Sequence, residues 1–337
     1  MEAIPIGGKC YEVPPVILED HSPPIILFAV GNRIQIVSLT SGKLIAVYTK
    51  HTSNVVKIFS SFTTTIISGS EDGLISHWNV DTLIEIKSHQ ISSTILDFLI
   101  PNSNLDSVYF VTNINETLDV PKPAEVSSTV TQKYTLKVFS TVNNVVASTL
   151  CPMRFAVNCL GSLTTSNEEY VVAVTHTSLN IWSVRSSSFH VTFKTDSGPI
   201  NCMAINSSQG VLATGHLKGV ITVWHALDTV LGGIKSTLNP CVLTGKQRPT
   251  CTVFHWHSLP LYTLHFNSNG NFLFSGGEEG VLVQWQLSSG SKSFLPRLGD
   301  AISSTVVSAQ EAWVVATTRD NAIQIIDMGR YSTFFML

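Results

Sequence analysis

The clearest pattern in the chain is a series of short apolar stretches between residues 261 and 299. Tyr262, Leu264 and Phe266 stand on alternate positions, which is typical of a strand with one buried face. Asn269-Gly270 favours a tight turn before the next apolar stretch. Three further strands are predicted over 272–274, 281–287 and 292–295. Four such strands form an antiparallel meander that cannot bury both of its faces alone.

The same pattern recurs along the chain at a near-constant period. Each repeat is marked by an apolar residue in its third strand, with an aliphatic residue three positions earlier and usually Gly or Asn five positions earlier. Successive markers are separated by 41, 61, 43, 42, 61 and 41 residues, so two of the repeats contain insertions. The seven markers are Val37, Trp78, Phe139, Trp182, Trp224, Trp285 and Ile326.

Seven repeats of this kind predict an all-β fold, a seven-bladed β-propeller. Because seven repeats use nearly all of the sequence, residues 1–337 are expected to form a single domain. The inner strand of the first blade is predicted at Val16–Leu18. Either Ile4–Ile6 or Tyr11–Val13 is expected to cross back and complete the last blade, which would remove free sheet edges.

The two insertions differ in composition. The first, residues 113–133, carries two prolines and almost no aromatic residues, so we expect an exposed, mobile loop. The second follows Trp224 and contains paired glycines and a close basic pair, Lys246 and Arg248. After it, residues 252–256 are expected to form the outer strand of the fifth blade.

The composition restricts the possible classes of function. Hydrophobic residues make up 44% of the chain and charged residues only 13%, so a large core can be buried. With a formal net charge of -3, the chain lacks the basic surface of a non-specific nucleic-acid binder, and any RNA contact must be local. The longest apolar run, Ile25–Val30, is too short to span a membrane.

The sequence offers no recognisable catalytic or metal-binding motif. Asp72, Glu279 and Asp320 recur at equivalent turn positions, so they are interpreted as turn residues instead of an acid-base pair. His255 and His257 share one face of a strand, but without a third ligand a metal site is not expected. Neither a phosphate-binding Gly-Lys-Ser/Thr segment nor a Cys-x-x-Cys pair occurs. We therefore expect no enzyme activity, no cofactor and no small-molecule substrate.

The second and sixth repeats resemble the WD-repeat family. In that family, a His before the first strand, a Ser or Thr in the second strand, an Asp in the following turn and the Trp of the third strand form a hydrogen-bonded chain. The matching residues of the second repeat are His51, Ser68, Asp72 and Trp78. Those of the sixth repeat are His257, Ser275, Glu279 and Trp285, with Glu in place of Asp. No repeat contains the Trp-Asp dipeptide itself, so the resemblance rests on the period and on this context.

A closer resemblance covers nearly the whole chain. Residues 273–277 (LFSGG), 281–285 (VLVQW) and 294–299 (FLPRLG), together with His255-Trp256-His257, are similar to the first propeller of the WD repeat-containing protein 75 family. The resemblance implies a nucleolar scaffold subunit of the UtpA (t-UTP) part of the small-subunit processome. It implies roles in pre-rRNA processing, rRNA transcription and small ribosomal subunit biogenesis. The implied partners are other UtpA WD-repeat subunits and pre-rRNA.

In that family a second propeller and a helical C-terminal region follow the first propeller. Neither is present before Leu337, so we expect the chain to be a fragment, a short isoform or an incomplete gene model. The predicted partner-binding regions of this chain are the 226–250 insertion, with Lys246 and Arg248, and the segment 294–298. In that segment Phe294, Pro296 and Arg297 are the candidates, because Pro296 limits extension of the sheet and Arg297 can pair with phosphate or carboxylate.

Alternative interpretations remain open at this point. Residues 294–298 could simply join blade six to blade seven. Trp182-Ser-Val-Arg185 is similar to the Trp-Asp-x-Arg box of WD-repeat substrate receptors of cullin ubiquitin ligases, although the Asp is missing. A substrate receptor, another generic protein-interaction propeller or a propeller enzyme are therefore the competing functions.

Overall fold

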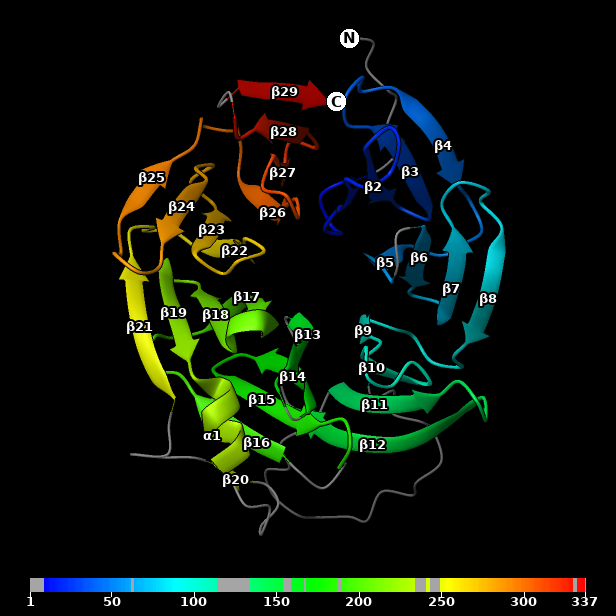
Figure 1. Cartoon of the computed structure of the whole chain (residues 1–337). Coiled ribbons are helices and arrows are strands. Elements are labelled where there is room, and N and C mark those ends of the chain that lie inside the picture. The colour runs from blue at the N-terminus through cyan, green and yellow to red at the C-terminus, as the bar shows by residue number, and fades with distance from the viewer. Residues whose placement is uncertain are drawn as a thin grey trace, which may run out of the picture.

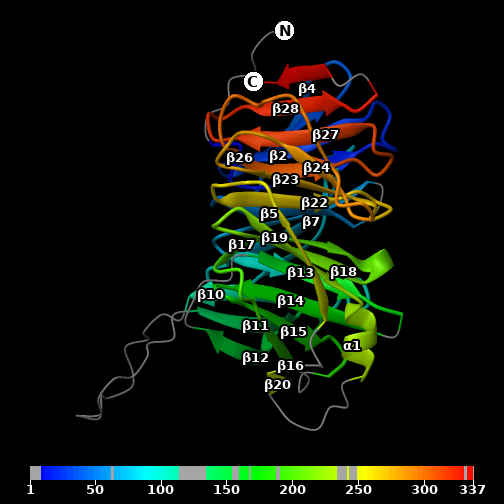
Figure 2. The ribbon, with the colours of Figure 1, turned by 90° about the vertical axis from the view of Figure 1, so that its left-hand side faces the viewer.

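Seven β-sheets stand around a common centre in the computed structural model (Figure 1). It describes residues 9–61, 64–113, 134–153, 159–166, 168–186, 190–233, 241–242, 249–329 and 332–336. Turned by 90°, the ring is seen edge-on as a disc (Figure 2). The prediction of an all-β, seven-bladed propeller is confirmed.

The strands of each blade follow one another from the centre of the ring to its outside. Blade one contains β1 (Val16–Leu18), β2 (Ile25–Val30), β3 (Arg33–Ser38) and β4 (Leu44–Tyr48). Blade two contains β5 (Val55–Ser60), β6 (Thr65–Ser70), β7 (Leu74–Asn79) and β8 (Glu85–Gln90). Blade three contains β9 (Asp97–Leu99), β10 (Ser107–Asn113), β11 (Tyr134–Ser140) and β12 (Val145–Met153). Blade four contains β13 (Cys159–Thr164), β14 (Glu169–Thr175), β15 (Ser178–Ser183) and β16 (His190–Lys194).

The remaining three blades follow the same plan. Blade five contains β17 (Ile200–Asn206), β18 (Val211–His216), β19 (Val220–His225) and β21 (Thr250–His255). Blade six contains β22 (Leu261–Phe266), β23 (Phe272–Gly277), β24 (Val283–Gln286) and β25 (Lys292–Phe294). Blade seven contains β26 (Ile302–Val307), β27 (Trp313–Thr318), β28 (Ile323–Asp327) and β29 (Ser332–Met336).

The core consists of the apolar layers between neighbouring blades. One layer joins Ile36 and Tyr48 of blade one to Ile66 and Trp78 of blade two, and the rings of Tyr48 and Trp78 stack with centroids 4.1 Å apart. Each of the seven sequence markers lies in the third strand of a blade and is buried in the layer between that blade and the preceding one. Burial of these layers explains why the marker period is so regular.

The inner strands do not follow strict alternation. The pairing of β22 with β23 shifts register between Leu261 and Thr263, and the inner strands of blades two, five and seven shift at the same place. Such a bulge adds a residue and turns the following side chains to the other face. The predicted buried face of Tyr262, Leu264 and Phe266 is therefore wrong in one member. Tyr262 is only half-buried, and Leu261 is buried in its place.

The last blade is completed by the C-terminal end of the chain and not by the N-terminal segment. Sheet order places β29 on the outer side of β28, and Tyr11–Val13 forms no strand, so the second of the two predicted crossings is wrong. Ile4–Ile6, the other predicted crossing, lies outside the described residues. Cys10 nevertheless contacts blade seven, since its backbone N–H donates to Oδ1 of Asn321 at 2.7 Å. Because β29 already occupies the outer edge of blade seven, the segment around Cys10 adds no strand there and packs against the blade mainly through side chains.

The second insertion adds two elements that the sequence did not predict. Helix α1 (Leu227–Gly233) follows β19 and buries Leu227 and Leu231 against blades four and five. Strand β20 (Cys241–Val242) then pairs in parallel with β16, so blade four has five strands. The predicted outer strand of blade five is confirmed as β21. The first insertion, apart from Asn113, lies outside the described residues. In the described part of the chain, no helix is long and apolar enough to cross a membrane.

Candidate protein-interaction surface

The hydrogen-bonded chain of blade two runs from a carboxylate in a turn to the indole in the third strand. Burial opposes ionisation of Asp72, but Ser70 donates to its Oδ1 at 2.5 Å, and the net pKa of Asp72 is below its usual value. Because the hydroxyl of Ser70 donates its proton to Asp72, its oxygen accepts a hydrogen bond from Nδ1 of His51 at 2.9 Å. Burial lowers the pKa of His51, so the ring stays neutral. Nε2 of His51 accepts from Ser68 at 2.7 Å, and Ser68 accepts from Nε1 of Trp78 at 3.0 Å.

Blade six builds the same chain with one residue fewer. Glu279 accepts directly from Nδ1 of His257 at 3.1 Å, and Nε2 of His257 accepts from Ser275 at 2.9 Å. Ser275 in turn accepts from Nε1 of Trp285 at 2.8 Å. Burial opposes ionisation of Glu279, but the backbone N–H of Leu259 and the His257 ring lower its net pKa. The chain thus ends on an ionised carboxylate, as it does in blade two.

The two chains differ at two coupled positions. Blade two has Ser70 and Asp72 where blade six has Gly277 and Glu279. The longer side chain of Glu279 reaches the imidazole without an intervening hydroxyl. A side chain at position 277 would place its Cβ 2.2 Å from the backbone oxygen of Pro260, so no hydroxyl can be accommodated there. Glu in place of Asp therefore preserves the chain of the WD-repeat pattern.

Blade five also links its third-strand Trp to a buried His, but this His stands at a position that the sequence did not predict. Trp224 donates to Thr214 at 3.1 Å, and Thr214 lies 3.2 Å from Nε2 of His216. Nδ1 of His216 then donates to the backbone oxygen of Gly198 at 2.9 Å. His216 stands where blade two has Ser70, directly after a Gly in the second strand. His216 directly after Gly215 is a usable signal in the sequence. It was not assigned this role because the WD-repeat pattern places the His before the first strand.

The segment 294–298 has both buried and exposed side chains. Leu295 and Leu298 are buried in the layer between blades six and seven. Phe294 is 50% exposed, and Pro296 and Arg297 are exposed as well. The interpretation as a joint and the interpretation as a binding segment are therefore compatible, because Leu295 and Leu298 join the blades while the other three residues face solvent. Because the buried side chains of Leu295 and Leu298 fix this segment, the outward side chains of Phe294, Pro296 and Arg297 are held in place.

An aromatic pair stands at the edge between blades five and six. The rings of Trp256 and Phe294 contact each other with centroids 4.7 Å apart, and both rings are partly exposed. Trp256 directly follows β21, and Phe294 ends β25. We call Val253, Trp256, Leu259 and Phe294 the blade five-six rim, because all four are exposed apolar residues in these adjoining segments.

The other residues singled out from the sequence fall in different places. Lys246 and Arg248 lie outside the described residues. Arg185 is exposed in the bend after β15. His255 is exposed whereas His257 is buried, and among the described residues no group of three or more His, Cys, Asp or Glu could hold a metal ion. Asp320 accepts from Thr318 at 2.5 Å, as expected of a turn residue.

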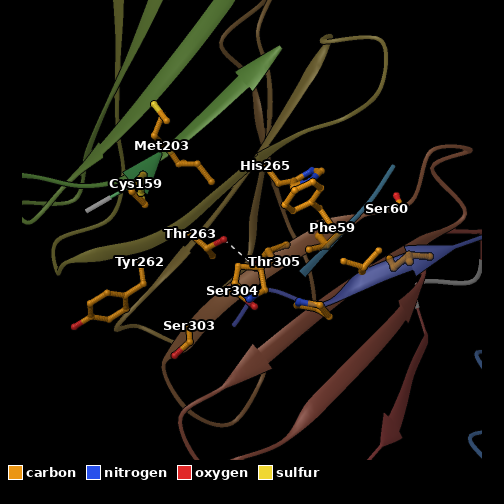
Figure 3. A pocket seen from close by; sticks show the side chains of 17 residues that line it. Phe59, Ser60, Cys159, Met203, Tyr262, Thr263, His265, Ser303, Ser304 and Thr305 are labelled. Atoms are coloured by element: carbon orange, nitrogen blue, oxygen red, sulfur yellow. Dashed lines mark hydrogen bonds between the residues drawn. The ribbon is translucent and has the colours of Figure 1, made fainter. Parts of the chain in front are cut away.

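The inner strands enclose a cavity of about 480 Å³ at the centre of the ring (Figure 3). Its lining includes hydroxyl groups such as Thr263, which accepts from the backbone N–H of Thr305 at 2.9 Å. Burial raises the pKa of the Cys159 thiol to about 12, and burial lowers the pKa of His265. The lining contains no carboxylate and no amine. The lining of this cavity therefore consists of neutral groups.

Comparison with known proteins gives a consistent result. A family model described as the first β-propeller of WD repeat-containing protein 75 matches residues 17–321. The chain is 26% identical over 340 residues to WD repeat-containing protein 75 of Danio rerio, covering 95% of this chain and 37% of that protein. The protein of the same name from Xenopus laevis is 30% identical over 275 residues, covering 78% of this chain and 29% of the relative. U3 small nucleolar RNA-associated protein 17 of Schizosaccharomyces pombe is 42% identical over 74 residues, which is 22% of this chain and 9% of that protein.

Proposed function

Because the chain belongs to the family of WD repeat-containing protein 75 first β-propellers, we propose that it is a non-catalytic docking scaffold of the small-subunit processome. In this proposal it acts in the nucleolus within UtpA (t-UTP) and supports pre-rRNA processing, rRNA transcription and small ribosomal subunit biogenesis. Its direct partners are other WD-repeat subunits of that assembly, and pre-rRNA is held within the same complex.

The names of two fungal relatives support this assignment. One is U3 small nucleolar RNA-associated protein 17 of Schizosaccharomyces pombe, and the other is NET1-associated nuclear protein 1 of Saccharomyces cerevisiae, 31% identical over 103 residues. The second match covers 31% of this chain and 9% of the relative. The chain spans about a third of the length of the vertebrate relatives, so the partners of the whole protein are part of the proposal.

The observation that carries the proposal is the outward-facing part of the segment 294–298. Phe294, Pro296 and Arg297 are exposed on a segment fixed from beneath by buried Leu295 and Leu298. Binding energy at protein interfaces concentrates in aromatic and arginine side chains that are already held in place before binding. This segment, extended by the blade five-six rim, supplies both residue types.

The charge and the cavity favour a scaffold over the competing functions. A net charge of -3 gives no general attraction for RNA, which favours a protein as the direct partner. The central cavity offers neutral groups to a bound molecule and no carboxylate or amine for proton transfer. These features support a role in assembly.

The test is recovery of partners from cells with the tagged chain carrying Phe294→Ala and Arg297→Ala. We expect recovery of the processome proteins to fall by about tenfold or more, because loss of two interface side chains removes more than about 1.4 kcal/mol of binding free energy. The melting temperature should change little, since both residues are exposed, only the contact of Phe294 with Trp256 is lost, and buried Leu295 and Leu298 are kept. The matched control is Ile84→Ala, another exposed apolar side chain on the outside of the ring.

Full recovery of the partners with the double variant would refute docking through this segment. A fall in melting temperature together with lost recovery would show that the segment acts only by joining the blades. Release of the partners by ribonuclease would show that RNA, and not a protein surface, bridges them.

A further inference from the structure

Strand β12 differs from the other outer strands of the ring. It has nine residues, whereas the outer strands of the other described blades have three to six. It runs along the outside of blade three (Figure 1). Among the described strands it pairs only with β11, so within the described part of the chain no strand covers the backbone N–H and C=O groups on its other side.

Two register shifts interrupt this edge, but it carries none of the charged side chains that usually prevent strands from pairing. No charged residue stands between Thr141 and Met153, and Pro152 lies only near the end. Two apolar side chains at the beginning of β12 are exposed, namely Val145 at 54% and Val146 at 41%, and Val142 in the turn before it is 71% exposed. Long, uncharged and apolar edges are the ones that pair with added strands, whereas Lys or a central Pro normally blocks them. In blade two, Glu85 and Lys87 provide such charges on the outer strand β8.

The neighbouring blade already carries an added strand. In blade four, β20 of the second insertion pairs in parallel with the outer strand β16, with Val191 opposite Cys241 and Thr192 opposite Val242. A short segment remote in sequence is therefore sufficient to extend a blade outward in this ring. In blade three, the described residues supply no equivalent of β20.

We propose that the outer edge of β12 binds an extended, uncharged segment of a partner protein as a fifth strand of blade three. The backbone groups of β12 would hold the segment, and Val145 and Val146 would contact its apolar side chains. Because β12 carries no charged side chain, a charged side chain on the added strand would find no counter-charge opposite it, so the edge favours an uncharged segment. The register shifts at Leu136/Lys137 and Val138/Phe139 are bulges that bend and twist β12. A flexible extended peptide can follow a bent strand more easily than the rigid surface of another propeller can.

The test uses a fluorescent peptide of alternating Val and Thr, nine residues long and flanked by lysines for solubility. The control peptide replaces every second residue by Pro and so lacks half of the N–H donors. Binding to the whole chain is measured by fluorescence anisotropy, and protected amides are located by hydrogen exchange and mass spectrometry. We expect the first peptide alone to bind and to protect the amides of β12.

The variant Val145→Lys with Thr149→Lys puts two cations on the edge and should weaken binding by about tenfold or more. The matched control, Ile86→Lys with Ser88→Lys, changes two exposed residues of β8 and should leave binding unchanged. Equal binding of both peptides, or protection elsewhere than β12, would overturn the proposal. Dimerisation of the chain that protects β12 would overturn it as well, because the occupant would then be a second copy.

Discussion

The carboxylate of Glu279 lies 3.1 Å from Nδ1 of His257 and hydrogen-bonds it directly. In blade two, Asp72 reaches the equivalent His51 only through the hydroxyl of Ser70. The two blades therefore fix the same imidazole tautomer with different pairs of residues. In each blade the turn carboxylate and the residue two positions before it therefore depend on each other. Asp72 needs the hydroxyl of Ser70 as a bridge, whereas Glu279 reaches its His without one.

Glu279→Asp should destabilise blade six. The shorter side chain withdraws the acceptor from Nδ1 of buried His257, and an unpaired buried donor costs about 1 to 3 kcal/mol. Denaturant unfolding of the variant measures this loss. Addition of Gly277→Ser should not restore stability, because its Cβ would lie 2.2 Å from the backbone oxygen of Pro260. Recovery of stability in the double variant would show that the blade two arrangement does fit in blade six.

Leu298→Ala and Arg297→Ala should have very different effects on stability. Leu298 is 1% exposed and packs between blades six and seven, so its truncation leaves a cavity and should cost about 2 to 4 kcal/mol. Arg297 faces solvent, and its truncation should change the free energy of unfolding by less than about 0.5 kcal/mol. Urea denaturation of both variants gives the comparison. Equal losses would mean that Arg297 contributes to the joint between the blades.

The inner strands of blades two, three and four are tied together by one ion pair. Nζ of Lys57 lies 2.8 Å from Oδ1 of Asp97 and 3.0 Å from the backbone oxygen of Leu160. The other carboxylate oxygen of Asp97 accepts from the N–H of Leu160 at 3.0 Å. Asp97→Ala should therefore cost about 1 to 3 kcal/mol, because it leaves a partly buried N–H and an ammonium group without this acceptor.

The matched control for Asp97→Ala is Glu278→Ala. Glu278 forms an ion pair with Arg319 at 3.2 Å, but both side chains are well exposed, so its loss should cost at most about 1 kcal/mol. Calorimetry of the two variants under the same buffer conditions separates the two cases. A larger loss for Glu278→Ala would contradict the greater importance of the inner tie.

His77 should make the stability of the protein depend on pH. Burial, aided by the charges of His89 and Lys87, lowers the pKa of His77 to about 4. The unfolded chain binds this proton near pH 6.5, so the contribution of His77 to stability is complete above about pH 6.5 and is lost as the pH falls toward about 4.

The measurement is the melting temperature of the wild type and of His77→Gln between about pH 7.5 and pH 4.5. Burial also lowers the pKa values of His51, His216 and His257, so the variant should retain a reduced dependence on pH. Parallel curves for the two proteins would contradict a contribution from His77.

The sequence predicts the architecture well because the same physical demand recurs in every blade. The third strand of each blade packs a large apolar residue against the preceding blade, and this recurring requirement sets the period that predicts seven blades. Tyr262 was misplaced because a bulge is decided by a local shift in pairing that leaves no signal in the alternation of residues. Tyr11–Val13 has the composition of a strand, but β29 already occupies the edge it would need.

The candidate site was predictable in part. The motif FLPRLG directed attention to a segment that is partly exposed, yet the sequence could not tell which of its residues face inward. That division depends on the layer between blades six and seven, where Leu295 and Leu298 meet residues from a different repeat. The role of His216 was not predicted because an imidazole can reach the hydroxyl of Thr214 from two places. It can stand before the first strand, as the WD-repeat pattern has it, or at the end of the second strand, as His216 does.

The contact between Cys10 and Asn321 marks where the ring closes on itself. Cys10 donates its N–H to this residue, and its side chain packs among Val315, Ile323 and Phe28. Among the described residues, this joint is made by side chains and single hydrogen bonds, without a strand shared between the first and last blades. A force that separates blade one from blade seven would therefore meet no backbone ladder among the described residues. Under tension the disc should open there while its separate sheets stay intact.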